Sequence, residues 1–253
     1  MTEAEWLACT DPREMLEYLG DRASERKCRL FGCACCRRVW RLLADERSRR
    51  VIEVTERYED GEATPEEMDQ AAEEADDASE SITTSRLGWG ADSLARHAAA
   101  WVPDVSHDAH QVAAEVAAFA ARAAATALAE AAADPRVDWL TAPQVEAPDP
   151  SKTAETLEQC RLLRCVFGNP FRQPPTIDPS LLTWSDGLVP KLARAAYEAP
   201  RLPAGTFDDA RLAVLADALE DAGCNDQTIL GNLRGPGPHV RGCWAVDLLL
   251  GKS

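Results

Sequence analysis

Apolar side chains recur every three or four residues along most of this chain, which is the spacing of one face of an α-helix. Strict alternation of apolar and polar residues, the pattern of a half-buried strand, is nearly absent. The clearest helical pattern gives two neighbouring apolar stripes: Cys28, Phe31, Cys35, Val39 and Leu42, and beside them Cys33, Cys36, Trp40 and Leu43. The pattern predicts an all-α protein, built as a compact multi-helix array or as two closely packed helical subdomains.

Capping residues set the expected helix boundaries. Residues 11–14 and 64–67 each place Asp or Thr at the N-cap, proline at the first helical position and glutamate three residues after the cap, which is the capping-box pattern. Gly223 is expected to close one helix near the C-terminus, and Asn225 or Asp226 to cap the next. The other helices are expected at about 24–43, 45–61, 106–133, 151–167, 186–198, 207–222, 226–233 and 240–250.

The helix expected at 106–133 is rich in alanine, with fourteen alanines between residues 112 and 133. Its larger apolar residues Val112, Val116 and Phe119 follow helical spacing and predict the buried stripe. Three charged residues interrupt the same run, and alanine is only weakly apolar, so the run is too polar for a membrane span. We expect no transmembrane helix.

Two proline-rich stretches interrupt the helical pattern. Residues 141–150 hold three prolines and few hydrophobic residues, which indicates a linker or an extended strap. A second break, at 168–179, holds four prolines. The expected organisation is an N-terminal helical region over 1–140, the linker, and a C-terminal helical region over 151–253.

Composition and charge narrow the classes of function. The 253 residues are 45% hydrophobic and 28% charged, which is typical of a folded globular protein. The formal net charge of −16 argues against binding of the whole molecule to nucleic acid or to an anionic membrane. The first five residues lack the basic and apolar regions of a secretory signal, so we expect a cytoplasmic protein.

Nine cysteines, four of them within residues 28–36, are the first candidates for chemistry. In a reducing compartment such cysteines are typical of buried cores first and of metal sites second. Helical spacing places all four on the apolar stripes, which favours the core. Cys33 and Cys36 stay weak candidates for a zinc site, with Cys160 and Cys165 as possible partners in space.

His107 and His110 are a second weak metal candidate. Two histidines three residues apart on a helix can chelate a transition metal when carboxylates from another helix complete the shell. These two fall at a predicted helix start, where an exposed cap region explains them without a ligand role. No metal ligand is therefore assigned, and no cofactor is predicted.

Charge is strongly segregated near the N-terminus. Residues 22–50 hold ten Lys or Arg, whereas residues 53–80 hold thirteen Asp or Glu and a single arginine. One interpretation is a basic helix that contacts phosphates through Arg37, Arg38 and Arg41. The favoured interpretation is that the basic and acidic helices pack side by side and neutralise one another.

The densest run of uncommon residues lies near the C-terminus, from residue 233 to residue 244. Its alternating Gly and Pro indicate a tight connection between helices. His239, Arg241 and Asp247 could meet near its exit as an acid-base or anion site, with Trp244 beside them. The alternative, which we favour, is a set of fixed polar contacts between helices, with Trp244 buried against Leu248.

The sequence lacks the Gly-x-Ser-x-Gly, Walker A, dinucleotide-binding, His-Glu-x-x-His and EF-hand motifs, which lowers the enzyme hypothesis without eliminating it. We therefore expect a non-catalytic protein-interaction or regulatory accessory module, with another protein as its partner and no membrane. The first alternative is a nucleic-acid-associated accessory protein that uses the basic segment 22–50. The second alternative is a metal-binding protein or enzyme.

Several motifs resemble an uncharacterised family of planctomycete helical proteins. They are Met1–Leu7, Cys35–Trp40, Phe167–Arg172, Leu215–Cys224 and the run from His239 to Trp244. The resemblance covers both ends of the chain, and the alanine-rich middle resembles a part that varies in length and composition. Gln173 separates Arg172 from Pro174, a departure from the family's Phe-Arg-Pro that falls in a loop. The resemblance implies no activity, cofactor or catalytic residue for this chain.

Overall fold

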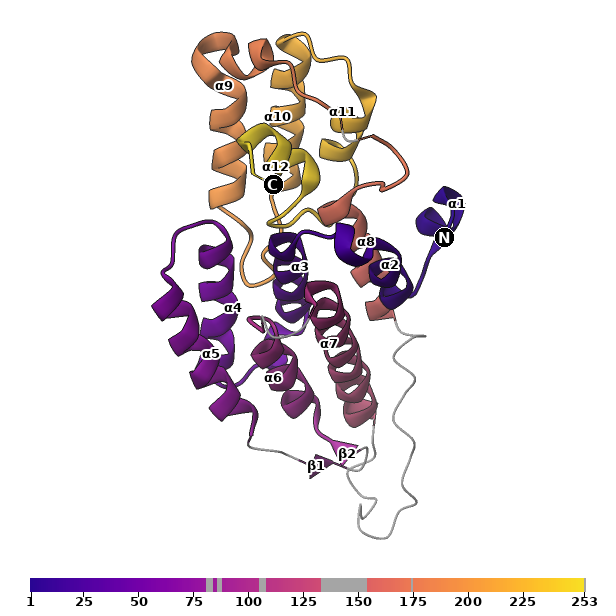
Figure 1. The fold of residues 1–253 in the computed structure, drawn as a ribbon, viewed down its shortest axis with the longest axis vertical. Coiled ribbons are helices and arrows are strands. Elements are labelled where there is room, and N and C mark those ends of the chain that lie inside the picture. The colour runs from indigo at the N-terminus through magenta and orange to yellow at the C-terminus, as the bar shows by residue number, and fades with distance from the viewer. Residues whose placement is uncertain (81–83, 86–87, 105–107, 133–153, 174, 253) are drawn as a thin grey trace. The chain divides into compact units, whose positions relative to one another are not determined.

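The computed structural model describes residues 1–252 except 81–83, 86–87, 105–107, 133–153 and 174 (Figure 1). Within these residues the regular structure is α-helical, apart from two short 3₁₀ helices and an antiparallel hairpin of two strands, β1 (Thr84–Ser85) and β2 (Gly88–Trp89). The predicted all-α array is confirmed. The helices are α1 (Glu3–Ala8), α2 (Pro12–Leu19), α3 (Glu25–Arg38), α4 (Glu46–Glu59), α5 (Pro65–Ser79), α6 (Ala91–Trp101), α7 (Ala109–Ala132), α8 (Ala154–Phe167), α9 (Pro179–Glu198), α10 (Asp209–Asp221), α11 (Gln227–Leu233) and α12 (Trp244–Leu250).

The chain divides into two compact units. The N-terminal unit comprises Cys9–Cys160, and the C-terminal unit comprises Met1–Ala8 together with Arg161–Ser253. The linker predicted at 141–150 lies outside the described residues. The division falls within α8 instead, and α1 belongs to the C-terminal unit.

Long-range hydrogen bonds explain why α1 belongs to the C-terminal unit. Trp6 is fully buried, and its backbone carbonyl accepts two hydrogen bonds from the Arg164 guanidinium, the shorter of 2.8 Å. The side-chain amide of Asn169 donates to the Glu3 carboxylate at 2.7 Å. These partners are 158 and 166 positions apart in the sequence, so local periodicity cannot reveal them.

The core of the N-terminal unit is formed by α3, α4, α5, α6 and α7, which pack against one another (Figure 1). Small side chains on α6 and α7 let these two helices approach closely, because the distance between packed helices depends on the side chains at the contact. The buried faces include Ala91, Ala95, Ala98 and Ala99 on α6 and Ala113, Ala117, Ala120 and Ala121 on α7. Val112 and Val116 are buried as predicted, whereas Phe119 is half-exposed.

The two predicted capping boxes differ in the structure. At α5, the Thr64 hydroxyl accepts from the Glu67 backbone N–H at 3.2 Å, and the Glu67 carboxylate accepts from the Thr64 N–H at 2.9 Å. At α2, Asp11 caps the helix through the Arg13 N–H, but the Glu14 carboxylate accepts from the Cys9 thiol instead of completing a box. The capping box predicted at Asp11 is therefore wrong, although the helix start is correct.

Removing the Thr64 hydroxyl should weaken α5 measurably. We expect Thr64→Ala to lower the free energy of unfolding of the N-terminal unit by about 1 kcal/mol, because two backbone donors at the helix start depend on this box. Urea unfolding followed by circular dichroism measures the change. Thr64→Ser keeps the hydroxyl and should lose much less, so an equal loss in both variants would contradict the assignment.

The first basic helix is shorter than predicted. The helix expected at about 24–43 ends at Arg38, and residues 40–42 continue as a 3₁₀ turn. Val39 leaves helical geometry with ψ +17°, and its N–H bonds to the Cys36 carbonyl three residues back, which tightens the last turn. Both apolar stripes still face the core, although Trp40 and Leu42 are half-buried.

The C-terminal unit packs α9 against α10 and α12, and α10 against α11 (Figure 1). Asp226 caps α11 through two backbone N–H groups, and Gly223 takes a left-handed φ of +101° after α10, both as predicted. The helix predicted at 186–198 begins earlier than expected. A first turn starts at Pro179, and non-helical residues 184–187 separate it from the rest of α9.

Helix α7 is long and apolar enough to cross a membrane by length and composition alone. Half of its most apolar window is buried within the N-terminal unit, against α2, α3 and α6. A core helix of a folded unit passes the same test of length and composition.

Candidate metal centre

Three potential metal ligands meet inside the C-terminal unit. Cys165 lies near the end of α8, His239 lies in the connection between α11 and α12, and Cys243 lies directly before α12. All three side chains are buried, with exposed fractions of 5%, 4% and 0%. The Sγ atoms and one imidazole nitrogen all lie within 4.8 Å of one another.

Backbone geometry fixes His239 in this position. Its carbonyl accepts a hydrogen bond of 2.7 Å from the Phe207 N–H, and the next residue, Val240, forms a bridge with Thr206. Gly237 has a left-handed φ of +65°, and a Cβ there would lie 3.1 Å from the backbone nitrogen of His239. The connection therefore requires glycine and holds the imidazole against the two sulfurs.

The ligand distances fit a tetrahedral metal. The Nδ1 atom of His239 lies 3.7 Å from the Cys243 Sγ and 3.9 Å from the Cys165 Sγ. In a tetrahedral zinc site, bond lengths of about 2.3 Å to sulfur and about 2.0 Å to nitrogen separate these ligand atoms by about 3.6 Å. The Asn232 Oδ1 lies 3.6 Å from the Cys243 Sγ.

The electrostatics favour a thiolate at Cys243. A hydrogen bond from the Cys165 thiol and a second interaction with His239 hold the pKa of Cys243 well below its usual value, although burial opposes this. The same hydrogen bond, together with burial, raises the pKa of Cys165. Burial lowers the pKa of His239, but the interaction with Cys243 outweighs it and leaves the pKa raised. Thiolate sulfur is the form of cysteine that binds metals.

Of the cysteines named from the sequence as possible zinc ligands, Cys165 belongs to this group, whereas Cys33 and Cys36 lie elsewhere. Cys33 and Cys36 are buried in the N-terminal unit, and burial raises the pKa of both thiols well above its usual value. The Cys33 thiol donates to the Ile52 carbonyl at 3.7 Å. His110 is half-buried on the first turn of α7, and His107 lies outside the described residues. Among the described residues, neither Cys33 nor Cys36 belongs to a group of three potential metal ligands.

The C-terminal residues named from the sequence are only partly brought together. His239 and Asp247 are buried, and the charge of Asp247 contributes to the raised pKa of Cys165. Arg241 instead lies over the Tyr197 ring, 4.9 Å from its centroid. The Trp244 indole packs against Gly168, where a Cβ would lie 3.2 Å from the ring. A sequence signal that could have marked the metal site is the four-residue spacing of His239 and Cys243.

Two of the three arginines named as candidates for phosphate contacts form ion pairs with glutamates. Arg37 is buried and pairs with Glu56 through two hydrogen bonds of 2.6 and 2.7 Å. Arg38 pairs with Glu155 at 2.7 and 3.0 Å, and Arg41 is exposed.

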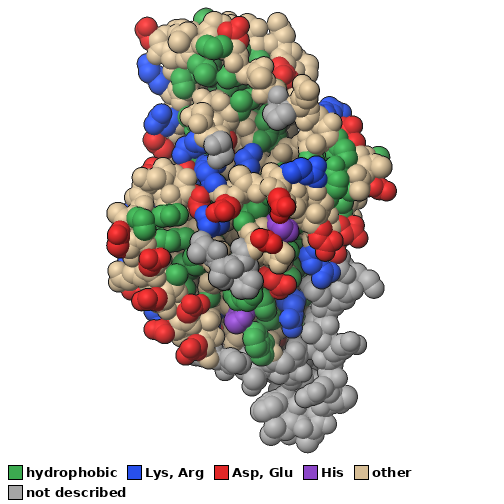
Figure 2. All heavy atoms as spheres, viewed as in Figure 1, with side chains coloured by type: hydrophobic (Ala, Val, Ile, Leu, Met, Phe, Trp, Pro, Cys, Tyr) green, Lys and Arg blue, Asp and Glu red, His purple; other side chains and the backbone are tan. Residues whose placement is uncertain are grey.

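Further ion pairs join the basic helices to acidic neighbours, as the favoured interpretation of the charge segregation predicts. They are Arg26 with Asp60, Arg29 with Glu59, and Arg50 with Glu74. Figure 2 shows acidic side chains interspersed with basic ones on the face drawn. This arrangement leaves little basic charge for a polyanion.

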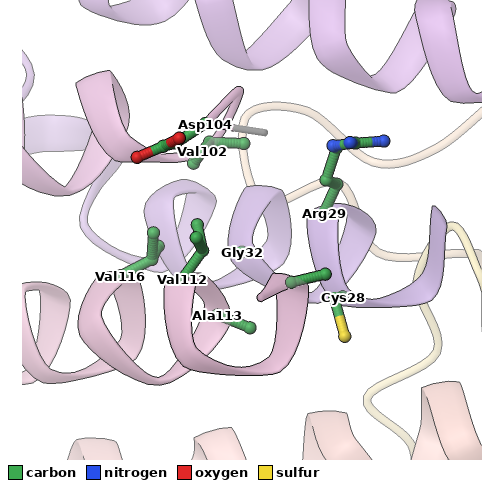
Figure 3. Close-up of a pocket in the computed structure, with 9 residues that line it drawn as sticks. Cys28, Arg29, Gly32, Val102, Asp104, Val112, Ala113 and Val116 are labelled. Atoms are coloured by element: carbon green, nitrogen blue, oxygen red, sulfur yellow. The ribbon is translucent and has the colours of Figure 1, made fainter. Parts of the chain in front are cut away.

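A small cavity in the N-terminal unit lies between α3, α7 and the segment after α6 (Figure 3). Gly32, Val112 and Val116 line its centre, and Arg29 and Asp104 lie at its rim. The space accommodates about one water molecule, which is too little for a substrate. Burial raises the pKa of the neighbouring Cys28 thiol to about 12, so this cysteine is not an activated nucleophile.

Filling this cavity should stabilise the protein. A Cβ on Gly32 would meet Val116 at 3.5 Å and Val102 at 3.7 Å, which are ordinary contacts, and Gly32 lies inside a helix. We expect Gly32→Ala to raise the free energy of unfolding by about 0.5–1 kcal/mol, because alanine loses less backbone entropy on folding. A urea midpoint for Gly32→Ala below that of the wild-type protein would contradict this expectation.

No protein-family model, curated protein or solved structure matches this chain. The family resemblance therefore stays a prediction from sequence motifs. The chemistry of the metal centre is argued from its residues alone.

Proposed function

We propose that this chain is a non-catalytic helical protein that binds one zinc ion through Cys165, His239 and Cys243. The observation that supports the proposal is the convergence of two buried sulfurs and an imidazole nitrogen within 4.8 Å. Thiolate and imidazole ligands are typical of zinc among the metals a cell supplies. Buried, potentially charged groups of this kind need a compensating partner, and a metal ion provides one.

The proposed role of the ion is structural. The three ligands come from α8, from the connection before α12 and from the N-cap of α12, so one ion would tie together segments up to 78 positions apart, from 165 to 243. The ligands are almost fully buried, whereas a catalytic zinc needs a coordination position that a substrate can reach. We propose that Asn232 closes the shell from α11.

The partner that we propose is another protein. The ion pairs of Arg37 and Arg38 and the net charge of −16 disfavour nucleic acid. A helical unit whose potential metal ligands are buried is suited to presenting a surface. For these reasons we propose a protein-interaction module, as the sequence favoured.

Cobalt(II) titration tests the metal proposal, because cobalt occupies tetrahedral zinc sites and absorbs visible light there. We expect one equivalent to bind per chain, with the absorption of a thiolate-ligated tetrahedral ion that zinc then displaces. Cys165→Ser and His239→Ala should each abolish this signal.

The matched control is the double variant Cys33→Ser and Cys36→Ser, which removes two buried cysteines of the N-terminal unit. This variant should bind cobalt with unchanged stoichiometry. Loss of binding in the control but not in Cys165→Ser would place the metal in the N-terminal unit and overturn the proposal.

A further inference from the structure

Helix α1 is held on the C-terminal unit by a few contacts from residues distant in the sequence. Arg164, in the last turn of α8, donates hydrogen bonds of 2.8 and 3.3 Å to the Trp6 carbonyl. Asn169 and Arg172 each donate one hydrogen bond of 2.7 Å to the Glu3 carboxylate. We call Arg164, Asn169 and Arg172 the docking residues.

Contacts that do not involve α1 fix the backbone of the docking residues. The Gly168 N–H bonds to the Arg164 carbonyl, and Gly168 takes a left-handed φ of +69° that ends α8 and turns the chain toward Asn169. The Asn169 side-chain oxygen accepts from the Phe171 N–H at 3.0 Å, which orients its amide nitrogen as the donor to Glu3. The Arg172 N–H bonds to the Asn169 carbonyl. A surface ordered in this way loses little entropy when it binds a ligand.

Helix α1 itself has a single anchor. Trp6 is fully buried and Glu3 is half-buried, whereas the other residues of α1 are exposed. Tryptophan is a typical anchor of protein interfaces. One buried side chain leaves little surplus over the entropy cost of ordering six residues. Helix α1 therefore belongs to the segments of low local stability, which open without unfolding of the rest.

The features that the docking residues contact are local to α1. The Glu5 N–H donates to the Thr2 hydroxyl at 3.3 Å, and the Thr2 N–H donates to the Glu5 carboxylate at 2.6 Å, so the helix carries its own capping box. Hydrogen bonds from Arg172 and Asn169 hold the pKa of Glu3 below its usual value, which favours the carboxylate. The recognised pattern is a carboxylate three residues before a buried indole.

We infer that the docking residues form a peptide-binding surface, which α1 occupies within the chain and from which a partner protein displaces it with a helical segment that has glutamate three residues before tryptophan. A longer helix of this kind outcompetes α1 because it can bury more than one anchor. A second copy of this chain offers only the same α1, against an intramolecular competitor whose effective concentration is about millimolar. The inference rests on the proposed protein-interaction role and names the chemistry of the partner.

Titration of the full chain with a fluorescein-labelled peptide of residues 1–10 tests the inference, with fluorescence anisotropy as the readout. Trp6→Ala removes the anchor of α1 from the chain, and we expect this variant to bind one peptide. The wild-type chain should bind the peptide at least about tenfold more weakly, because its own α1 competes. A peptide that carries Trp6→Ala should bind neither chain.

Further variants separate recognition from folding. Glu3→Ala in the chain loosens α1 without removing a buried side chain, so it should bind the peptide more tightly than the wild-type chain does. Adding Arg172→Glu to the Trp6→Ala chain should lower the affinity several-fold, and a peptide that carries Glu3→Lys should regain part of it. The matched control adds Arg194→Glu instead, which changes an exposed arginine of α9 and should leave the affinity unchanged.

Three results would each overturn the inference. They are equal binding of the Trp6→Ala peptide, no binding to folded Trp6→Ala and Glu3→Ala chains, and a wild-type dimer at micromolar concentration that Trp6→Ala dissociates. Cobalt titration of the same proteins measures the metal centre separately. A Trp6→Ala chain that binds cobalt but not the peptide overturns this inference alone, whereas peptide binding to a protein that takes up no cobalt overturns only the metal proposal.

Discussion

Replacing Cys243 with alanine is expected to abolish zinc binding and to lower the stability of the C-terminal unit by about 4 kcal/mol at a free zinc concentration about 1,000 times the dissociation constant. The reason is that a metal bound only by the folded state adds its binding free energy to folding. Thermal unfolding in zinc and in a strong chelator measures the effect. The wild-type melting temperature should fall on chelation, and that of Cys243→Ala should be the same in both conditions.

A matched control separates metal loss from packing loss. Cys224 is also buried in the C-terminal unit but is not one of the three ligands. Cys224→Ala should lose only packing energy and should keep the dependence of its melting temperature on zinc. If chelation leaves the wild-type protein unchanged, the ion has no structural role.

Arg37→Ala is expected to destabilise the N-terminal unit by about 3–5 kcal/mol, because it leaves the carboxylate of Glu56 buried without its partner. The two side chains are 5% and 11% exposed, and the guanidinium also lies 4.9 Å from the centre of the Trp40 ring. Removing one member of such a pair costs far more than the pair contributes as a whole. Urea unfolding of the variant and the wild-type protein measures the loss.

The matched control is Arg50→Ala, which breaks a pair with Glu74 on the surface between α4 and α5. At 48% and 29% exposure, this pair should contribute no more than about 1 kcal/mol. The double variant Arg37→Met, Glu56→Leu should recover much of the stability that Arg37→Ala loses, since no charge is left unpaired. Similar losses for Arg37→Ala and Arg50→Ala would contradict the buried geometry.

Local signals in the sequence predicted the local structure well. Thr64 and Asp226 cap helices as expected, and Val112 and Val116 are buried, because each of these features depends on residues within a few positions. The membership of α1 in the C-terminal unit was not predictable, since it depends on contacts such as that of Trp6 with a distant arginine.

The sequence did not indicate that the three residues of the candidate metal centre lie together. His239 and Cys243 were part of a run marked as unusual, whereas Cys165, 74 positions before His239, was named only as a possible partner of Cys33 and Cys36. The crowded cysteines at 28–36 attracted attention because they are adjacent in sequence, yet adjacency on a helix placed them in the core. A ligand set assembled from separate segments becomes recognisable only when the tertiary fold is known.

The most direct test of the metal centre is the metal content of the protein purified without added metal and without a metal-binding tag. We predict one zinc per chain in the wild-type protein and in the Cys33→Ser, Cys36→Ser double variant, and none in Cys165→Ala. A folded wild-type protein without stoichiometric metal, or a Cys165→Ala variant that keeps its zinc, would contradict the assignment.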